Sequence, residues 1–229
     1  SMKPYPCCRH THPAIDSALD IVAQAGGPLA LADLAGAALT TYPAALDVCD
    51  RPLPETAYQA KFSLQHTVLQ ALTQGQIGFD SFDEAARAGL QAGQAPVVLA
   101  VGHEFATVYP NAWGARLDVQ TRDGKTWRAE TDQALGDPAK PLDRAAVVAK
   151  ARRLLALAEE ALGAPPVPYL WAACGSQGRQ EQTGVSDQDN CLILDDSVTE
   201  EQMPYFAALA KFVCDGLDAC GYVYCPGDM

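Results

Sequence analysis

The sequence has little of what a membrane or secreted protein needs. No apolar run in its 229 residues approaches the roughly 18 that a membrane-spanning helix takes. It also shows no secretory signal, which would combine a basic start with a short apolar stretch. We therefore expect a soluble cytoplasmic protein that has no membrane partner.

Basic residues are scarce as well. Lysine and arginine number 16 against 28 aspartates and glutamates, and the net charge is −12. Proteins that coat nucleic acids use basic patches to bind the phosphate backbone. The charge balance therefore argues against a nucleic-acid partner.

The eight cysteines contain no Cys-x-x-Cys pair, and Cys7 and Cys8 are adjacent. This spacing does not fit a zinc site or a disulfide framework, so we expect reduced and mostly buried thiols. A content of 48% hydrophobic and 19% charged residues is typical of a globular chain. The length suits one large domain or two ordinary ones.

A polar segment over residues 174–190 lies between two apolar runs, 169–173 and 191–194, which we expect to form strands. Asp187 and Asp189 are separated by one residue, so their side chains share one face of an extended chain. Neighbouring carboxylates repel each other unless a cation lies between them, and hard oxygen ligands suit Mg²⁺. The spacing therefore predicts that these two aspartates are metal ligands.

The start of the same segment has the chemistry of a phosphate site. Gly175 allows backbone N–H groups to approach phosphate oxygens, Ser176 can donate its hydroxyl, and Arg179 offers a planar fork. A glycine-rich turn followed by a solvated acidic loop is the alternative interpretation.

Together, the Gly-Ser pair, the short spacer and the Asp-x-Asp pair resemble the signature of the DNA polymerase β-like nucleotidyltransferase superfamily. Residues 175–190 are more closely similar to PII-uridylyltransferase-like domains, which often accompany CBS domains in bacterial signalling proteins. Those domains have Gly-Ser-x-Gly-Arg-x-Glu-Gln followed by Asp-Gln-Asp-Asn. The resemblance implies an NTP site with Mg²⁺ as cofactor, formed by phosphate-binding Gly175, Ser176, Gly178 and Arg179 and by catalytic, metal-binding Asp187 and Asp189.

Apolar periodicity, turn residues and caps predict the other elements. Capping boxes are expected at Ser81 with Glu84 and at Thr199 with Gln202. Helices are expected over residues 14–25, 55–74, 82–88, 143–162 and 200–220, strands over 34–47, 96–101 and 222–225, and a hairpin around the turn at 122–125.

Several short motifs follow one another along the first part of the chain. They are Lys3-Pro-Tyr-Pro-Cys-Cys with His12 and Ile15-Asp16, Cys49-Asp50-Arg51-Pro52, Gln59-Ala60-Lys61-Phe62-Ser63-Leu64, and Gly136-Asp137-Pro138 with Pro141-Leu142. In this order they resemble the smaller α+β domain of the MmgE/PrpD family, which includes 2-methylcitrate dehydratase and cis-aconitate decarboxylase.

This second resemblance implies that Lys3 and His12 contribute to a tricarboxylate site. Cations pair with carboxylates, and histidine can carry protons. In the family most acid/base residues come from a helical domain, which we expect to be missing from this chain. The alternative is that both side chains are exposed near a chain end and have no chemical role.

The sequence predicts an α+β fold in which a long helix joins two α/β segments. The two resemblances meet inside this helix, near residues 150–156, whereas natural domain boundaries usually fall in exposed linkers. We therefore interpret the chain as a recombined or engineered chimera. Its expected domains are 1–150, an MmgE/PrpD-like sheet with helices, and 151–229, a truncated polymerase β-like fold.

Three functions stay open. The first is a residual Mg²⁺-dependent nucleotidyltransferase-like half-site that binds an NTP in an incomplete enzyme. The resemblance implies a third carboxylate on a later strand, and only Asp228, near the chain end, remains for that place. The second is an MmgE/PrpD-type lyase that dehydrates or decarboxylates a small tricarboxylic acid, and the third is a chimera without catalysis. A nucleotide or small-molecule substrate is the expected partner, and apolar faces exposed by missing domains predict a homo-oligomer.

Overall fold

A computed structural model describes residues 3–93, 96–174, 189–219 and 224. The chain divides into two compact units, unit 1 over residues 1–142 and unit 2 over residues 143–229. Helices and strands occur in both units, and the predicted α+β class is confirmed. Within the described residues, no helix is both long and apolar enough to cross a membrane.

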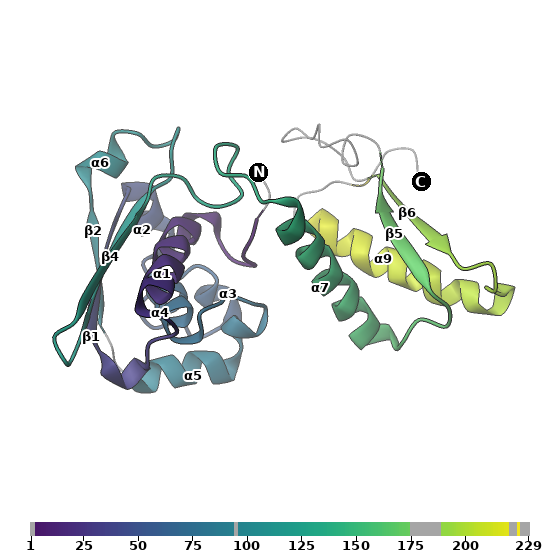
Figure 1. Ribbon diagram of the computed structural model, residues 1–229, viewed down its shortest axis with the longest axis horizontal. Helices are drawn as coiled ribbons and strands as arrows, with labels where there is room; N and C mark the ends of the chain where they lie inside the picture. The colour runs from purple at the N-terminus through teal and green to yellow at the C-terminus, as the bar shows by residue number, and fades with distance from the viewer. Residues whose placement is uncertain (1–2, 94–95, 175–188, 220–223, 225–229) are drawn as a thin grey trace. The chain divides into compact units, whose positions relative to one another are not determined.

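Unit 1 is built on a four-stranded sheet in the order β2-β1-β3-β4. Its strands are β1 (Leu34–Thr41), β2 (Val97–Val101), β3 (Ala115–Thr121) and β4 (Thr126–Thr131). Strand β1 pairs parallel with β2 and antiparallel with β3, so Leu39 lies between Leu99 and Leu117. Helices cover one face of this sheet (Figure 1).

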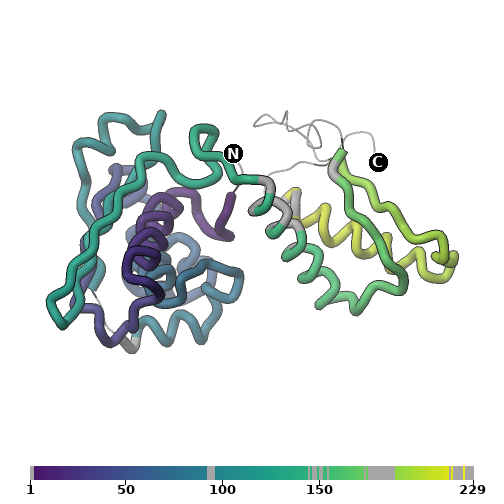
Figure 2. Tube along the Cα trace, viewed as in Figure 1, coloured from purple at the N-terminus to yellow at the C-terminus, as the bar shows by residue number. Residues whose placement is uncertain are grey.

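The helices of unit 1 are α1 (His12–Ala25), α2 (Pro43–Cys49), α3 (Ala57–Ala60), α4 (Leu64–Gln74), α5 (Glu84–Gly93) and α6 (His103–Ala106), with short 3-10 helices η1 (Arg9–Thr11), η2 (Leu31–Asp33) and η3 (Asp80–Phe82). Helix α1 packs against β3, β4 and α4, and α4 also contacts β2 (Figure 2). These contacts place the core between the sheet and the pair α1 and α4.

The burial of alternate residues in β3 shows which face of the sheet is covered. Leu117 and Val119 are buried, whereas Arg116 and Asp118 point to the opposite face. On that face Arg128 of β4 donates to Asp118 at 2.5 Å. The predicted hairpin is confirmed, and Gly124 in its turn has φ of 86°, a conformation that side chains disfavour.

Two predictions for the first half of the chain are wrong in their boundaries. The strand expected over 34–47 ends at Thr41, because Pro43 occupies the first turn of α2. The helix expected over 55–74 is two helices, because Ser63 is extended and caps α4 by accepting the His66 N–H at 3.0 Å.

The capping box expected at Ser81 and Glu84 is also wrong. Asp83 provides the cap of α5, since its carboxylate accepts the Ala86 N–H at 2.7 Å. The Ser81 hydroxyl instead accepts the Gly78 N–H at 2.9 Å and closes the loop before the helix. An aspartate is as good a cap as serine, so the sequence pattern alone could not separate the two.

Ser63→Ala is expected to lower the free energy of unfolding by about 1–2 kcal/mol. The fully buried hydroxyl accepts from His66 and donates to the Arg51 carbonyl at 2.6 Å, so both groups lose a partner. Urea unfolding measures the change, with Thr56→Ala at the exposed cap of α3 as the control of smaller effect. A Ser63→Ala protein as stable as the parent would contradict this account.

Unit 2 consists of α7 (Arg144–Leu162), β5 (Tyr169–Ala173), β6 (Asn190–Leu194), η4 (Glu200–Gln202) and α9 (Met203–Ala219). The two strands form an antiparallel hairpin. Ala158 of α7 and Phe206 and Leu209 of α9 form its small core. The predicted helix over 143–162 and the capping box at Thr199 are confirmed. The strand expected over 222–225 lies outside the described residues except for Tyr224.

The hairpin has an inner and an outer face. Tyr169, Trp171 and Leu192 point inward and pack against the core. Leu170 and Ile193 alternate with them and are 58% and 55% exposed. The outer face is therefore open to solvent and partly apolar, and homo-oligomer formation through it stays a prediction.

Candidate functional sites

The segment that precedes α1 brings the separate motifs of unit 1 together. The Cys8 N–H donates to the Lys61 carbonyl at 2.9 Å. Arg9 forms a half-buried ion pair with Asp137, which lies 128 residues further along the chain. The motifs at residues 3–8, 59–64 and 136–138 therefore meet at one end of the unit.

Asp16 in α1 connects the segment before α1 to the residues around 135–140. This side chain is 5% exposed and accepts hydrogen bonds from the Tyr5 hydroxyl at 2.7 Å and the Leu135 N–H at 2.6 Å. Burial raises the pKa of Asp16, against the lowering effect of these bonds and of Lys140, 3.9 Å away. Asp16 thereby links residues 5, 135 and 140 to one helix.

His10 lies in an aromatic cluster that the sequence did not reveal. Its imidazole stacks on Trp113 with ring centres 4.6 Å apart, and its Nδ1 lies 3.0 Å from the Tyr42 hydroxyl. Tyr42 in turn stacks on Tyr109 at 4.6 Å. Burial lowers the pKa of His10 and raises that of Tyr42, so the neutral forms of both are favoured.

The described cysteines are all free thiols, as expected, but only Cys7 and Cys49 are buried. The Cys49 thiol donates to the Cys8 sulfur, and this bond lowers the pKa of Cys8 to about 6, helped by the His10 N–H and the charge of Lys3. The same bond raises the pKa of Cys49, and burial raises that of Cys7 to about 12. Cys8 is therefore the thiol of this cluster with thiolate character at neutral pH.

The two residues proposed for the lyase side lie in different environments. Lys3 is exposed. His12 in the first turn of α1 is fully buried and meets Tyr5 edge-on, with ring centres 5.1 Å apart. The fold therefore places Lys3 at the surface and His12 within the core.

The candidate nucleotide site belongs to the end of the β5–β6 hairpin at which the chain passes from β5 to β6. Ala173 pairs with Asn190, and the Cys174 N–H donates to the Asp189 carbonyl at 2.7 Å. The segment between them contains most of the predicted site. Gly175, Ser176, Gly178, Arg179 and Asp187 lie outside the described residues, and Asp189 is described.

Asn190 braces this end of the hairpin. Its side-chain oxygen accepts from the Trp171 indole N–H at 3.3 Å, and its amide bonds the Cys214 sulfur. Asp189 directly precedes β6, and the alternation of the strand, continued by one residue, would place its side chain on the other, outer face. The hydrogen bond between Cys174 and Cys191, whose sulfurs lie 3.5 Å apart, raises the pKa of Cys174, and the charge of Asp189 adds a smaller effect.

No group of three or more histidine, cysteine, aspartate or glutamate side chains is placed to hold a metal ion within the described part of the chain. Asp187, half of the predicted metal pair, lies outside that part. The Mg²⁺ prediction is therefore untested.

Comparisons with known proteins find two family models that match parts of the chain. The model described as "Putative nucleotidyltransferase DUF294" matches residues 144–229. The model of the MmgE/PrpD C-terminal domain matches residues 5–162, well over half of the chain. A comparison with curated proteins gives no match. The motifs that converge before α1 all lie within the larger match or at its edge, and the chain belongs to the MmgE/PrpD family through its C-terminal domain.

Proposed function

We propose that unit 2 binds a nucleoside triphosphate together with Mg²⁺ at the end of the β5–β6 hairpin where Ala173 pairs with Asn190. The observation that carries this proposal is the position of Asp189. Its backbone is held by Cys174, and its neighbour Asn190 is anchored on the inner face. Among the described residues, no hydrogen bond or ion pair engages the Asp189 carboxylate, so it is available to a cation.

The residue types of the segment fit this ligand. Asp187 and Asp189 are hard oxygen donors that would hold Mg²⁺, which would neutralise phosphate charge when bound. Gly175, Ser176, Gly178 and Arg179 would bind the phosphates through backbone N–H groups, the hydroxyl and the guanidinium. The nucleotidyltransferase family match over residues 144–229 supports the assignment.

Thermal unfolding of the full chain tests the proposal. Mg²⁺ with ATP or UTP at ten times the dissociation constant is expected to stabilise the protein by about 1.4 kcal/mol. Asp189→Asn and Asp187→Ala should each remove most of this shift, and chelation of Mg²⁺ with EDTA should abolish it. Asp196→Asn, which removes an exposed charge beyond the far end of β6, is the control that keeps the shift. A shift that survives Asp189→Asn would rule out this site.

We further infer that the chain is a chimera joined within α7. The two family matches overlap over residues 144–162, which are the residues of this helix. A helix common to both parents allows a splice without a new turn or linker. In the folded chain the whole of this helix belongs to unit 2, which begins at residue 143.

The alternative function, a tricarboxylate site at Lys3 and His12, has less support. A ligand in solvent can reach Lys3, but His12 is covered by Tyr5 and the start of α1. A thermal shift with citrate and none with nucleotides would favour this alternative over the nucleotide site.

A further inference from the structure

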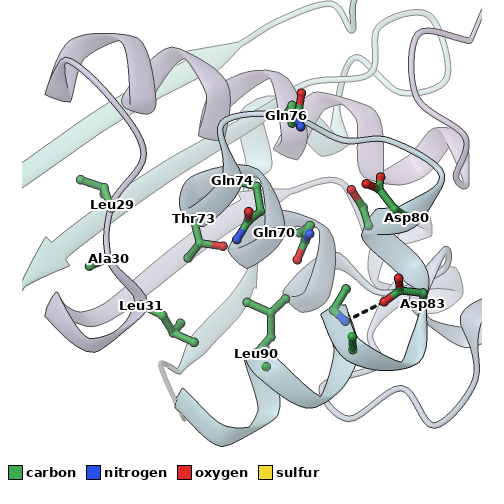
Figure 3. Close-up of a pocket in the computed structure, with 14 residues that line it drawn as sticks. Leu29, Ala30, Leu31, Gln70, Thr73, Gln74, Gln76, Asp80, Asp83 and Leu90 are labelled. Atoms are coloured by element: carbon green, nitrogen blue, oxygen red, sulfur yellow. Dashed lines mark hydrogen bonds between the residues drawn. The ribbon is translucent and has the colours of Figure 1, made fainter. Parts of the chain in front are cut away.

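A groove in unit 1, separate from both sites above, has the size of a small-molecule site. It encloses about 480 Å³ between α4, α5, η3 and the segment at residues 29–31. Ligand pockets of proteins typically measure about 300–1,000 Å³. Figure 3 shows Gln70 and Thr73 projecting from α4 toward the space that Leu31 and Leu90 border.

Gln70 and Ser81 are the mostly buried polar residues of this groove, 7% and 4% exposed. The Gln70 carboxamide makes no side-chain hydrogen bond within the described chain and faces the groove, where solvent can bond it. A primary amide has two donor hydrogens and an acceptor oxygen. A ligand in the groove would replace this solvent and bond the same atoms.

The charge of the lining selects the kind of ligand. Asp80 and Asp83 line the groove, and no lysine, arginine or histidine does. One Asp83 oxygen is engaged by the Ala86 N–H, whereas Asp80 makes no side-chain hydrogen bond or ion pair among the described residues. Both carboxylates are exposed, so solvent screens part of their charge. Because no basic group in the lining offsets them, the groove still attracts a cation and repels an anion.

We propose that this groove binds a small amphipathic organic cation. The apolar part of the ligand lies between Leu31 and Leu90, and its ammonium group faces Asp80 and the Gln70 carbonyl oxygen. This chemistry is opposite in sign to the nucleotide and tricarboxylate ligands discussed above. The groove is therefore a third site, independent of the proposed nucleotide function.

Titration of the full chain with n-hexylammonium, monitored by ligand-observed NMR, tests the proposal. A ligand of this size is expected to bind with a dissociation constant of roughly 1 mM. Hexanoate has the same chain with the opposite charge and is expected not to bind. Gln70→Leu and Asp80→Asn should each weaken hexylammonium binding about tenfold, because each removes one partner of the ammonium group.

Asp47→Asn removes an exposed charge on α2 and is the matched control that leaves binding unchanged. Circular dichroism verifies that each variant is folded, and Asp80→Asn tests the site even if Gln70→Leu does not fold. Three results would overturn the proposal. They are the absence of hexylammonium binding, equal binding of hexanoate, and binding that neither variant weakens.

Discussion

Asp16→Ala is expected to lower the free energy of unfolding by about 3 kcal/mol at neutral pH. The alanine leaves the Tyr5 hydroxyl and the Leu135 N–H without their acceptor in a buried position. It also removes the charge that attracts Lys140. The segment before α1 and the residues at 135–140 would then lose their common anchor, and urea unfolding at fixed pH measures the loss.

Two variants and the pH dependence make this prediction specific. Asp20→Ala lies on the exposed side of α1 and is expected to change stability by no more than about 0.5 kcal/mol. Asp16→Asn keeps one acceptor oxygen but turns an NH₂ group toward the second donor, so its effect should be intermediate.

The sign of the pH dependence follows from the raised pKa of Asp16 in the folded chain. The folded state binds this proton more tightly than the unfolded chain, whose aspartates titrate at about 3.9. The stabilising contribution of Asp16 is therefore complete below that value and decreases as the pH rises through the folded pKa. The stability difference between the parent and Asp16→Ala should grow as the pH is lowered from 7, and a difference that shrinks would contradict the burial of this carboxyl.

The sequence predicted the elements whose signals are local. The hairpin at 122–125 needs only its Asp-Gly turn and alternating arms, and the helix after Thr199 needs only its capping box. Local signals could not predict the residue at which β1 ends. Its last residue, Thr41, pairs with Val101 and Ala115, which are 60 and 74 residues further along the chain. Whether Pro43 interrupts a strand or starts a helix depends on that pairing.

The candidate sites also depend on contacts between distant residues, which local sequence signals do not reveal. The order of the motifs identified the family, but their meeting point depends on contacts such as Arg9 with Asp137. The doublet Cys7-Cys8 was visible in the sequence, and Cys49 belonged to a separate motif. Only the fold brings the Cys49 thiol to Cys8 and separates it from Cys7, so the difference in acidity between adjacent cysteines was not predictable.

Cys8 is expected to react with iodoacetamide about tenfold faster at pH 6 than a thiol of ordinary pKa in the same position. With its pKa near 6, about half of Cys8 is thiolate at that pH, whereas an ordinary thiol is thiolate in well under 1% of molecules. Low-pKa thiolates are weaker nucleophiles, which offsets roughly tenfold of this advantage of about 150-fold. Peptide mass spectrometry follows the labelling of each cysteine separately.

The Cys49 side chain allows a matched pair of variants. Cys49→Ser keeps a hydroxyl donor for the Cys8 sulfur, so the labelling rate should still reach half of its maximum near pH 6–7. Cys49→Ala removes the donor, and the half-maximal rate should move toward the ordinary thiol pKa of about 8.5. Cys7, whose pKa burial raises, should label slowly in every variant. If Cys49→Ala left the profile of Cys8 unchanged, the thiolate would owe its stability to Lys3 and the His10 N–H, and the hydrogen bond from Cys49 would have no part in it.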